Sequence, residues 1–283
     1  MGAPVTGSLC AVVLAAGEGT RLRPLTFLRP KALCPVGNVA LLDRALTDVD
    51  AAGLRGAEAV AVNASWLADQ VDDHLAGRTH LSVETDGPLG TTGGVARLRD
   101  WINGRAVLVA NADAYRRGAG LRALLDGWDG ECVRLLGVPA SAGAVGTFSG
   151  LTFAGASLLP WRWVRDLDVT RPELVHSVWR PAEAAGVLQV VVHAGHFTDA
   201  GTPADYLAAN LHAAGDGNLI ADDAVVTGPC HRAVVGAGAA VHGALTRAVV
   251  WPGAHVGAHE HLVDAVRAGQ AGRAVTVTSA RLA

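Results

Sequence analysis

The sequence has few cysteines, no block of basic residues and no long apolar run. Its four cysteines, Cys10, Cys34, Cys132 and Cys230, contain no Cys-x-x-Cys pair, so we expect neither a zinc site nor a disulfide framework. The net charge is −3, with 23 basic against 26 acidic residues, which argues against nucleic acid or an anionic membrane as a partner. No apolar run reaches the roughly 20 residues that cross a bilayer, and no signal-peptide pattern opens the sequence. We therefore expect a cytoplasmic protein.

Neither of the two common phosphate-binding loops is present. The segment Leu14–Pro24 follows the apolar run Leu9–Leu14 and is rich in glycine and arginine, so its backbone N–H groups and cations suit phosphate. Leu22 stands where a dinucleotide-binding loop has its third glycine, and there is no Gly-Lys-Ser/Thr of a Walker loop. Lys31, ten residues beyond Arg21, adds another cation. A glycine turn with surface cations is the structural alternative.

Apolar strands alternate with helical patterns in the first part of the chain, which is typical of βαβ units. The expected strands are 9–14, 59–62, 81–84 and 106–110, and the expected helices are 40–52, 65–75 and 92–100. Further strands are expected at 132–138, 150–154 and 188–192. A last helix, with Thr202 as its N-cap, should run to about residue 213. The predicted fold class is α/β, a Rossmann-like mixed and mostly parallel sheet flanked by helices, with ligands at the carboxyl ends of its strands.

The composition changes beyond Gly215. Short Ala-Val-Val triplets at 224–226, 233–235 and 248–250 alternate with glycines in imperfect six-residue repeats. Such repeats predict a short C-terminal left-handed parallel β-helix, and an irregular valine-rich cap is the alternative. The expected domains are therefore 1–213 and 214–283. So few coils should need docking to the first domain or to another subunit, and a homo-oligomer, a dimer or tetramer, is the first expectation.

The glycine-rich segment resembles the signature of the sugar-1-phosphate nucleotidylyltransferases. That signature is Leu-Ala-Ala-Gly-x-Gly-Thr-Arg-Leu-x-Pro-Leu-Thr followed by Pro-Lys-Ala/Pro-Leu, and it matches Leu14–Thr26 and Pro30–Leu33. The resemblance implies an enzyme that takes an NTP and a sugar 1-phosphate and makes an NDP-sugar and pyrophosphate. The valine-rich tail is similar to the truncated hexapeptide-repeat tail of many bacterial members, which usually serves assembly.

The resemblance also assigns roles to residues. Arg21 would hold the pyrophosphate, and Lys31 the α-phosphate with the attacking oxygen. Asn111-Ala112-Asp113 resembles the family's Asn-Gly-Asp, and Asp199 lies in a segment similar to Trp/Phe-x-Asp-Ile-Gly-Thr-Pro, so Asp113 and Asp199 are the implied ligands of a Mg²⁺ ion. An acidic residue before a helix N-terminus is the structural alternative for Asp199. The nucleotide-binding residues implied are Leu14, Ala15, Ala16, Gly17, Gly19, Thr20, Arg21, Gly90, Thr91 and Asn111.

The sugar site is the less defined part of the resemblance. Asn63, at a strand's carboxyl end, Gly155 and His196 are the candidate sugar contacts. Thr152–Gly155 matches Thr-Phe-Ser/Ala-Gly of the N-acetylmuramate-1-phosphate uridylyltransferases, although a register through Ser149–Leu151 fits other branches as well. The family's Glu-Lys-Pro element is missing between residues 138 and 150.

The choice of nucleotide remains open between two branches. Pro88-Leu89-Gly90-Thr91 resembles the mannose-1-phosphate guanylyltransferases, whereas Asn63–Gln70 and Thr152–Gly155 resemble the uridylyl-transferring branch. GTP therefore ranks slightly above UTP, and both above dTTP. A regulatory paralogue that binds an NDP-sugar without turnover is the alternative function. The presence of Arg21, Lys31, Asp113 and Asp199 together argues against it.

Overall fold

The computed structural model describes residues 9–118, 120–140, 145–171, 173–270 and 274–278. They belong to two compact units that interleave along the chain. The first unit contains the residues up to Glu18 together with Leu42–Phe197. The second contains Gly19–Leu41 and the residues from Thr198 onward. The domain boundary between residues 213 and 214, which was expected from the change in composition, stays a prediction.

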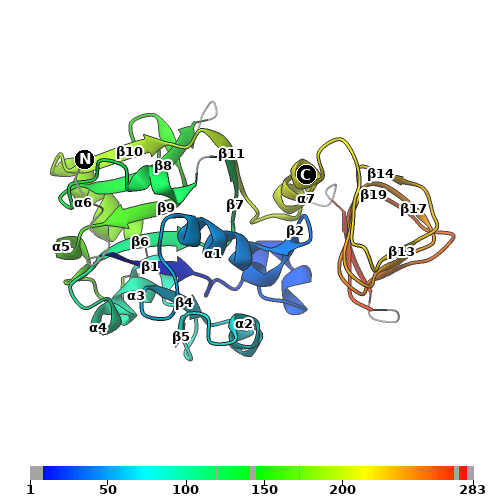
Figure 1. Ribbon diagram of the computed structural model, residues 1–283, viewed down its shortest axis with the longest axis horizontal. Coiled ribbons are helices and arrows are strands. Elements are labelled where there is room, and N and C mark those ends of the chain that lie inside the picture. Colours follow the sequence, from blue (N-terminus) through cyan, green and yellow to red (C-terminus); the bar gives the residue numbers. More distant parts are fainter. Residues whose placement is uncertain (1–8, 119, 141–144, 172, 271–273, 279–283) are drawn as a thin grey trace. The chain divides into compact units, whose positions relative to one another are not determined.

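The first unit is built on a seven-stranded sheet with the order β10-β8-β9-β6-β1-β4-β5 (Figure 1). Its strands are β1 (Leu9–Leu14), β4 (Val60–Ala64), β5 (His80–Val83), β6 (Ala106–Asn111), β8 (Val133–Pro139), β9 (Leu151–Leu159) and β10 (Leu188–Val192). β9 is antiparallel to β6 and β8, and the other neighbouring strands are parallel. The predicted mixed and mostly parallel sheet is confirmed. β7 (Ala114–Gly118) pairs separately with β11 (Gly195–Asp199), in which the chain passes from the first unit to the second.

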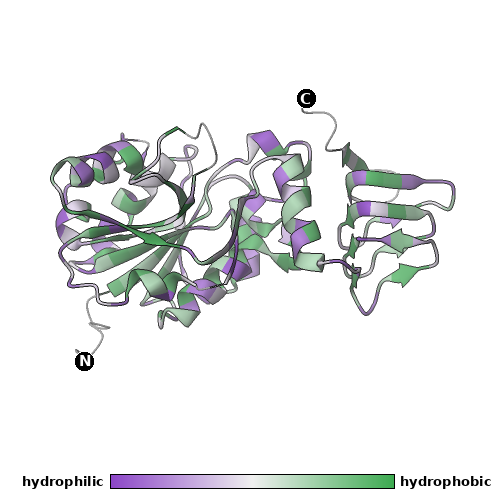
Figure 2. Ribbon diagram, turned by 90° about the horizontal axis from the view of Figure 1, so that it is seen from above, coloured by the Kyte–Doolittle hydropathy of each residue, from purple (hydrophilic) through white to green (hydrophobic). Residues whose placement is uncertain are grey.

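Helices bury both faces of this sheet. They are α1 (Leu41–Ala51), α2 (Ala68–Leu75), α3 (Gly90–Arg97), α4 (Arg99–Ile102), α5 (Trp161–Val164) and α6 (Arg180–Ala184), together with the 3-10 helix η4 (Leu121–Leu124) and the π-helix η5 (Val175–Trp179). On one face, Cys10 and Val12 of β1 join a core that includes Val95, Ile102 and Trp179. The alternate residues of β1 are fully buried as well, so they face a second apolar layer. Figure 2 shows the hydrophobic colouring along these strands.

Two of the predicted helices begin or end elsewhere. α2 starts at Ala68 rather than at Ser65, because Leu67 takes a left-handed conformation with φ 52°. No side chain caps α2, whose N-cap position is Leu67, and the hydroxyl of Ser65 donates to the carbonyl of Glu84 at 2.9 Å. The single helix predicted over 92–100 is two helices, α3 and α4, which meet at Leu98.

A buried chain of hydrogen bonds joins the carboxyl ends of β1, β4 and β5. The side-chain oxygen of Asn63 accepts the N–H of Ala15 at 2.7 Å, and its Nδ2 donates to Glu84 Oε1 at 2.7 Å. The other oxygen of Glu84 accepts the N–H of Leu89 at 2.7 Å. Asn63 and Glu84 are each only 2% exposed. One buried pair therefore holds both the loop after β1 and the segment that leads into α3.

The second unit combines the glycine-rich loop, one long helix and a coil of short strands. The loop contains η1 (Thr20–Leu22), η2 (Leu25–Phe27), η3 (Lys31–Leu33) and the hairpin β2 (Pro35–Val36) and β3 (Val39–Ala40). α7 (Pro203–Ala214) is capped by Thr202, whose hydroxyl oxygen accepts the N–H of Asp205 at 3.2 Å, as the capping pattern predicts. None of the helices in the described ranges is long and apolar enough to cross a membrane.

The strands after α7 form a parallel coil, here called the C-terminal coil. They are β12 (Leu219–Ile220), β13 (Val225–Val226), β14 (Cys230–His231), β15 (Val234–Val235), β16 (Ala240–Val241), β17 (Ala244–Val250), β18 (His255–Val256) and β19 (His261–Ala268), followed by the antiparallel β20 (Val275–Thr278). Val225 pairs with Ala240, which pairs with His255, so successive turns are 15 residues apart there. This arrangement is consistent with the predicted β-helix, with turns shorter than three six-residue repeats. Its left hand stays a prediction.

Gly94 in α3 gives a test of the buried pair. Alanine in place of a helical glycine ordinarily stabilises a protein by about 0.5–1 kcal/mol. A Cβ at Gly94, however, would lie 2.5 Å from Asn63 Nδ2 and 3.3 Å from Glu84 Oε1. We expect Gly94→Ala to lower the free energy of unfolding by about 1–3 kcal/mol in urea denaturation, because it forces this pair apart.

Gly120→Ala is the matched control. Gly120 has a φ of −72°, and a Cβ there would meet no atom within 4 Å. Its substitution should change the unfolding free energy by no more than about 0.5 kcal/mol. A Gly94→Ala protein as stable as the wild type would contradict the close packing of Asn63 and Glu84 against α3.

Candidate active site

The first unit has a cavity of about 220 Å³ at the carboxyl ends of its parallel strands, here called the strand-end cavity. It is lined by Leu14, Ala16, Gly17, Asn63, Pro88, Gly90, Thr91, Asn111, Asp113 and Glu173. All of these except Pro88 and Glu173 are among the nucleotide, sugar or metal contacts predicted above. The structure therefore brings together predicted residues from four separate stretches of sequence.

Strand register explains why they meet. Leu14, the last residue of β1, pairs with Asn63 of β4 on one side and with Asn111 of β6 on the other. The N–H of Ala112 then donates to the carbonyl of Leu14 at 3.0 Å, which holds the chain just before Asp113. Parallel strands in register place their carboxyl ends in one row, so the three strand-end residues and Asp113 share one edge of the sheet.

A buried cation lies near Asp113. Arg116 of β7 is 7% exposed, and its Nε is 3.1 Å from Asp48 Oδ2. Burial lowers the pKa of the Arg116 guanidinium, while the negative charges of Asp48 and Asp113 act in the opposite direction. Sequence reasoning did not identify Arg116, because it belongs to no recognised motif.

Two predicted contact residues already use their side chains within the protein. The hydroxyl of Thr91 donates to Glu173 Oε2 at 3.2 Å and accepts the N–H of Leu174 at 2.8 Å. Asn63 is held between Ala15 and Glu84, as described above. These side chains shape the wall of the cavity. Gly90, with a φ of +75°, needs to be glycine for its backbone conformation.

Glu84 and Glu173 were not predicted as site residues. Glu84 is the last residue of the strand predicted over 81–84, so the rule that ligands collect at carboxyl ends could have identified it. Glu173 lies in a stretch with no motif, and it reaches the cavity only through its packing beside Thr91.

Two predicted sugar contacts have packing roles and do not line the strand-end cavity. Gly155 has a φ of +76°, and a Cβ there would lie 2.7 Å from Ala114 Cβ and 2.9 Å from Arg116 Nη1. The ring of His196 packs edge-on against Tyr115, with centroids 5.6 Å apart. Sugar binding by Gly155 and His196 stays a prediction.

In the second unit, two predicted cations, Lys31 and Arg21, lie beside the carboxylate of a third predicted residue, Asp199. Lys31 Nζ is 3.3 Å from Asp199 Oδ1, and Arg21 Nη2 is 3.6 Å from Asp199 Oδ2. Lys31 is only 7% exposed, whereas the side chains of Arg21 and Asp199 are 66% and 53% exposed. The Lys31 side chain is thus shielded from water while its partner Asp199 is half-exposed, and the Arg21 pair is a solvent-exposed contact of small energetic weight.

Gly19 and Thr26 fix the backbone around Lys31. Gly19 has a φ of +62°, and a Cβ there would lie 2.8 Å from Thr26 Cγ2 and 3.0 Å from Lys31 Cβ. The Thr26 hydroxyl donates to the carbonyl of Gly19 at 2.9 Å. Only glycine allows this close approach in a left-handed conformation. Gly19 therefore packs directly against the base of the Lys31 side chain.

Lys31 is also the only lysine in the sequence, since every other basic side chain that carries a fixed charge is arginine. Arginine spreads its charge over a planar fork, whereas lysine presents a compact ammonium on a flexible stem. The use of a single lysine therefore distinguishes Lys31 independently of the sequence motif.

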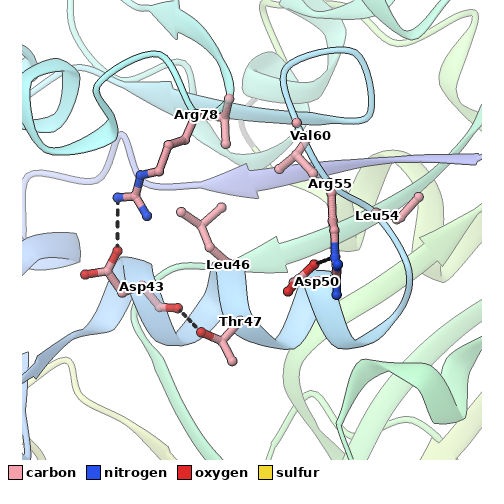
Figure 3. Close-up of a pocket in the computed structure, with 10 residues that line it drawn as sticks. Asp43, Leu46, Thr47, Asp50, Leu54, Arg55, Val60 and Arg78 are labelled. Carbon is pink, nitrogen blue, oxygen red and sulfur yellow. Dashed lines mark hydrogen bonds and ion pairs between the residues drawn. The ribbon is translucent and has the colours of Figure 1, made fainter.

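A larger cavity of about 460 Å³ lies elsewhere in the first unit (Figure 3). It is lined by residues of α1, by the segment before β4 and by Arg78 and Thr79 before β5, so it is away from the carboxyl ends of these strands. Arg78 Nη2 is 3.3 Å from Asp43 Oδ1, and Arg55 forms an ion pair with Asp50. Its cations are balanced by its own carboxylates, and it contains none of the predicted site residues.

The sequence of this chain matches a known protein family. The model of the MobA-like NTP transferase domain matches residues 11–160. An N-acetylmuramate alpha-1-phosphate uridylyltransferase of Caulobacter vibrioides is 38% identical over 148 residues, which cover 47% of this chain and 60% of that protein. A mannose-1-phosphate guanylyltransferase of Mycobacterium tuberculosis is 36% identical over 126 residues, covering 43% of this chain and 34% of that protein. The chain thus spans only part of the length of the curated relatives it matches.

Solved structures agree on the fold. A putative glucose-1-phosphate thymidylyltransferase from Bacillus anthracis has a TM-score of 0.63 at 18% identity, covering 72% of this chain and 95% of that one. HddC from Yersinia pseudotuberculosis has a TM-score of 0.59 at 20% identity, covering 71% and 97%. The family match spans about half of the sequence, including β1, the loop that follows it and Asp113. The chain belongs to the MobA-like NTP transferase domain family.

Proposed function

We propose that this protein transfers a nucleoside monophosphate from an NTP to a sugar 1-phosphate, releasing pyrophosphate. The observation that carries the proposal is the strand-end cavity, in which the loop after β1, the Pro88–Thr91 segment and Asp113 line one space. Both curated relatives named above are nucleotidylyltransferases of sugar 1-phosphates by name.

The reaction needs positioning and charge neutralisation more than a protein nucleophile. A phosphate oxygen of the sugar 1-phosphate attacks the α-phosphorus of the NTP, and the bond from that phosphorus to the oxygen of pyrophosphate breaks. Donors held in place where negative charge develops stabilise such a transition state. We assign Lys31 to the α-phosphate, because a buried ammonium acts more strongly than one in water. Arg21, which is largely exposed, is assigned to the departing pyrophosphate.

The donor groups are compatible with magnesium. Mg²⁺ prefers oxygen ligands and is commonly held by one or two carboxylates together with substrate phosphates and water. Asp113 lines the strand-end cavity, and Asp199 is half-exposed with Lys31 and Arg21 as neighbours. A bound Mg²⁺ would neutralise phosphate charge, with Asp113 and Asp199 as its proposed ligands.

A substrate screen tests the proposed function. Pyrophosphate release should be measured with the four NTPs against mannose 1-phosphate, N-acetylmuramate 1-phosphate and glucose 1-phosphate. We expect turnover with a guanine or uracil nucleotide, with GTP ahead of UTP and both ahead of dTTP. NDP-sugar binding without pyrophosphate release in any combination would support the regulatory alternative instead.

Removing the charge of Lys31 should impair catalysis. Lys31→Met is expected to lower kcat/KM by about 10²-fold or more, because it deletes a shielded cation aimed at the α-phosphate. Steady-state kinetics with pyrophosphate detection would measure this. Arg122→Met removes an exposed charge from η4 and serves as the control, with near wild-type rates expected. A Lys31→Met enzyme with an unchanged rate would make the loop a glycine turn without a catalytic role.

The proposed metal ligands give a separate test. Asp113→Asn is expected to lower kcat by about 10²-fold or more while the protein stays folded, because one hard oxygen ligand is weakened. Asp199→Asn should behave similarly. Magnesium titrations of the rate should show a weaker apparent affinity in both variants, and Asp126→Asn on the exposed surface should match the wild type. Full turnover of either site variant at saturating magnesium would remove that aspartate from the proposed site.

A further inference from the structure

The segment on either side of Lys31 is held by the C-terminal coil. Two residues before Lys31, the guanidinium of Arg29 lies over the ring of Trp251, 5.3 Å from its centroid. Four residues after Lys31, the carbonyl of Pro35 accepts a hydrogen bond from the hydroxyl of Tyr206 in α7. The indole N–H of Trp251 donates to that same hydroxyl at 3.0 Å. Trp251 thus contacts one flank of Lys31 directly and the other through Tyr206.

The contact between Trp251 and Tyr206 is fully enclosed. Trp251, which follows β17 of the coil, is 3% exposed, and Tyr206 is completely buried. Their rings pack edge to face with centroids 6.4 Å apart. Burial holds the pKa of the Tyr206 hydroxyl well above its usual range, so the hydroxyl keeps its proton and donates to Pro35 while it accepts from Trp251.

Additional contacts tie the hairpin after Lys31 to the same unit. The side-chain oxygen of Asn210 in α7 accepts the N–H of Gly37 at 2.9 Å, and its Nδ2 donates to the carbonyl of Tyr206 at 3.0 Å. Asn38 donates from Nδ2 to the carbonyl of Val235 in the coil at 2.9 Å. Gly37 and Asn38 both have positive φ values, which suit a tight two-residue hairpin. The hairpin therefore has little freedom to move relative to α7 and the coil.

We propose that Trp251 is a positioning residue, through which the C-terminal coil sets the place of Lys31. Resting on the proposed function, this inference gives the coil a part in catalysis in addition to any part in assembly. Trp251 does not touch a substrate phosphate in this proposal, and it acts by fixing Arg29 and Pro35. The effect is expected to be large, because a displacement of about 1 Å of a catalytic group can cost 10²-fold in rate.

The single lysine allows this proposal to be tested without any turnover. An amine-reactive reagent can modify one ε-amine in the whole chain, that of Lys31, and peptide mapping separates it from the terminal amine. The Lys31 side chain is 8% exposed, so labelling of the full-length wild type should be slow. Trp251→Ala should raise the labelling rate of Lys31 by about 10-fold or more, because labelling follows the population of the opened loop. Amide hydrogen exchange should rise over residues 29–40 in the same variant.

Two further variants make the comparison specific. Val256→Ala opens a smaller buried gap in the coil at a fully buried position of β18, and it should leave Lys31 labelling unchanged even if the melting temperature falls. Trp251→Phe keeps the ring over Arg29 and removes the N–H, so its labelling rate should lie between wild type and Trp251→Ala. If Trp251→Ala fails to fold, the Lys31 labelling rate of Trp251→Phe tests the proposal by itself.

A double-mutant cycle tests whether Trp251 acts through Lys31. Trp251→Ala should lower kcat by about 10-fold or more with a smaller change in KM, and this loss should disappear in a Lys31→Met background. Losses that simply multiply, or unchanged Lys31 labelling in folded Trp251→Ala and Trp251→Phe proteins, would overturn the proposal. If the wild type shows no turnover with any substrate pair, the proposed function fails, and the labelling and exchange results still decide whether the coil positions Lys31.

Discussion

The side-chain amide of Asn63 joins two loops that lead to one cavity. An amide offers an acceptor and a donor, and here the acceptor takes the N–H of Ala15 while the donor binds the buried carboxylate of Glu84. That carboxylate holds Leu89 in turn. Removing any member would leave a buried polar group unsatisfied, at a cost of about 1–3 kcal/mol. The absence of a side chain at Gly94 leaves the room in which this pair sits.

Much of the first unit could be predicted because short, contiguous stretches of its sequence define the strands and their ends. Each apolar run was long enough to define a strand, and the carboxyl-end rule placed Leu14, Asn63 and Asn111 on one edge before their register was known. The start of α2 was not predictable in this way. Ser65 has the chemistry of an N-cap, but α2 begins only after Leu67, which takes a left-handed conformation, and the Ser65 hydroxyl donates to the carbonyl of Glu84 just after β5, a contact that exists only once the sheet has formed.

In the second unit, local sequence patterns predict the elements but not the contacts between distant segments. Composition separated the tail from the rest of the chain, and the coil of short parallel strands agrees with that reading. The glycine-rich loop, in contrast, belongs to the same compact unit as the tail, through partners that no short window contains. Glu173 and Arg116 were missed for a related reason, since each reaches its neighbours by tertiary packing rather than through a motif.

The order of synthesis follows from this interleaving. Lys31 is separated from Asp199 by 168 residues, Pro35 from Tyr206 by 171, and Asn38 from Val235 by 197. At ribosomal rates of about 5–20 residues per second, the loop waits roughly 10–40 s for these partners to be made. During that interval these three contacts cannot form. Contacts between residues so far apart in the sequence form slowly, so the glycine-rich loop can reach its native packing only after the tail has been synthesised.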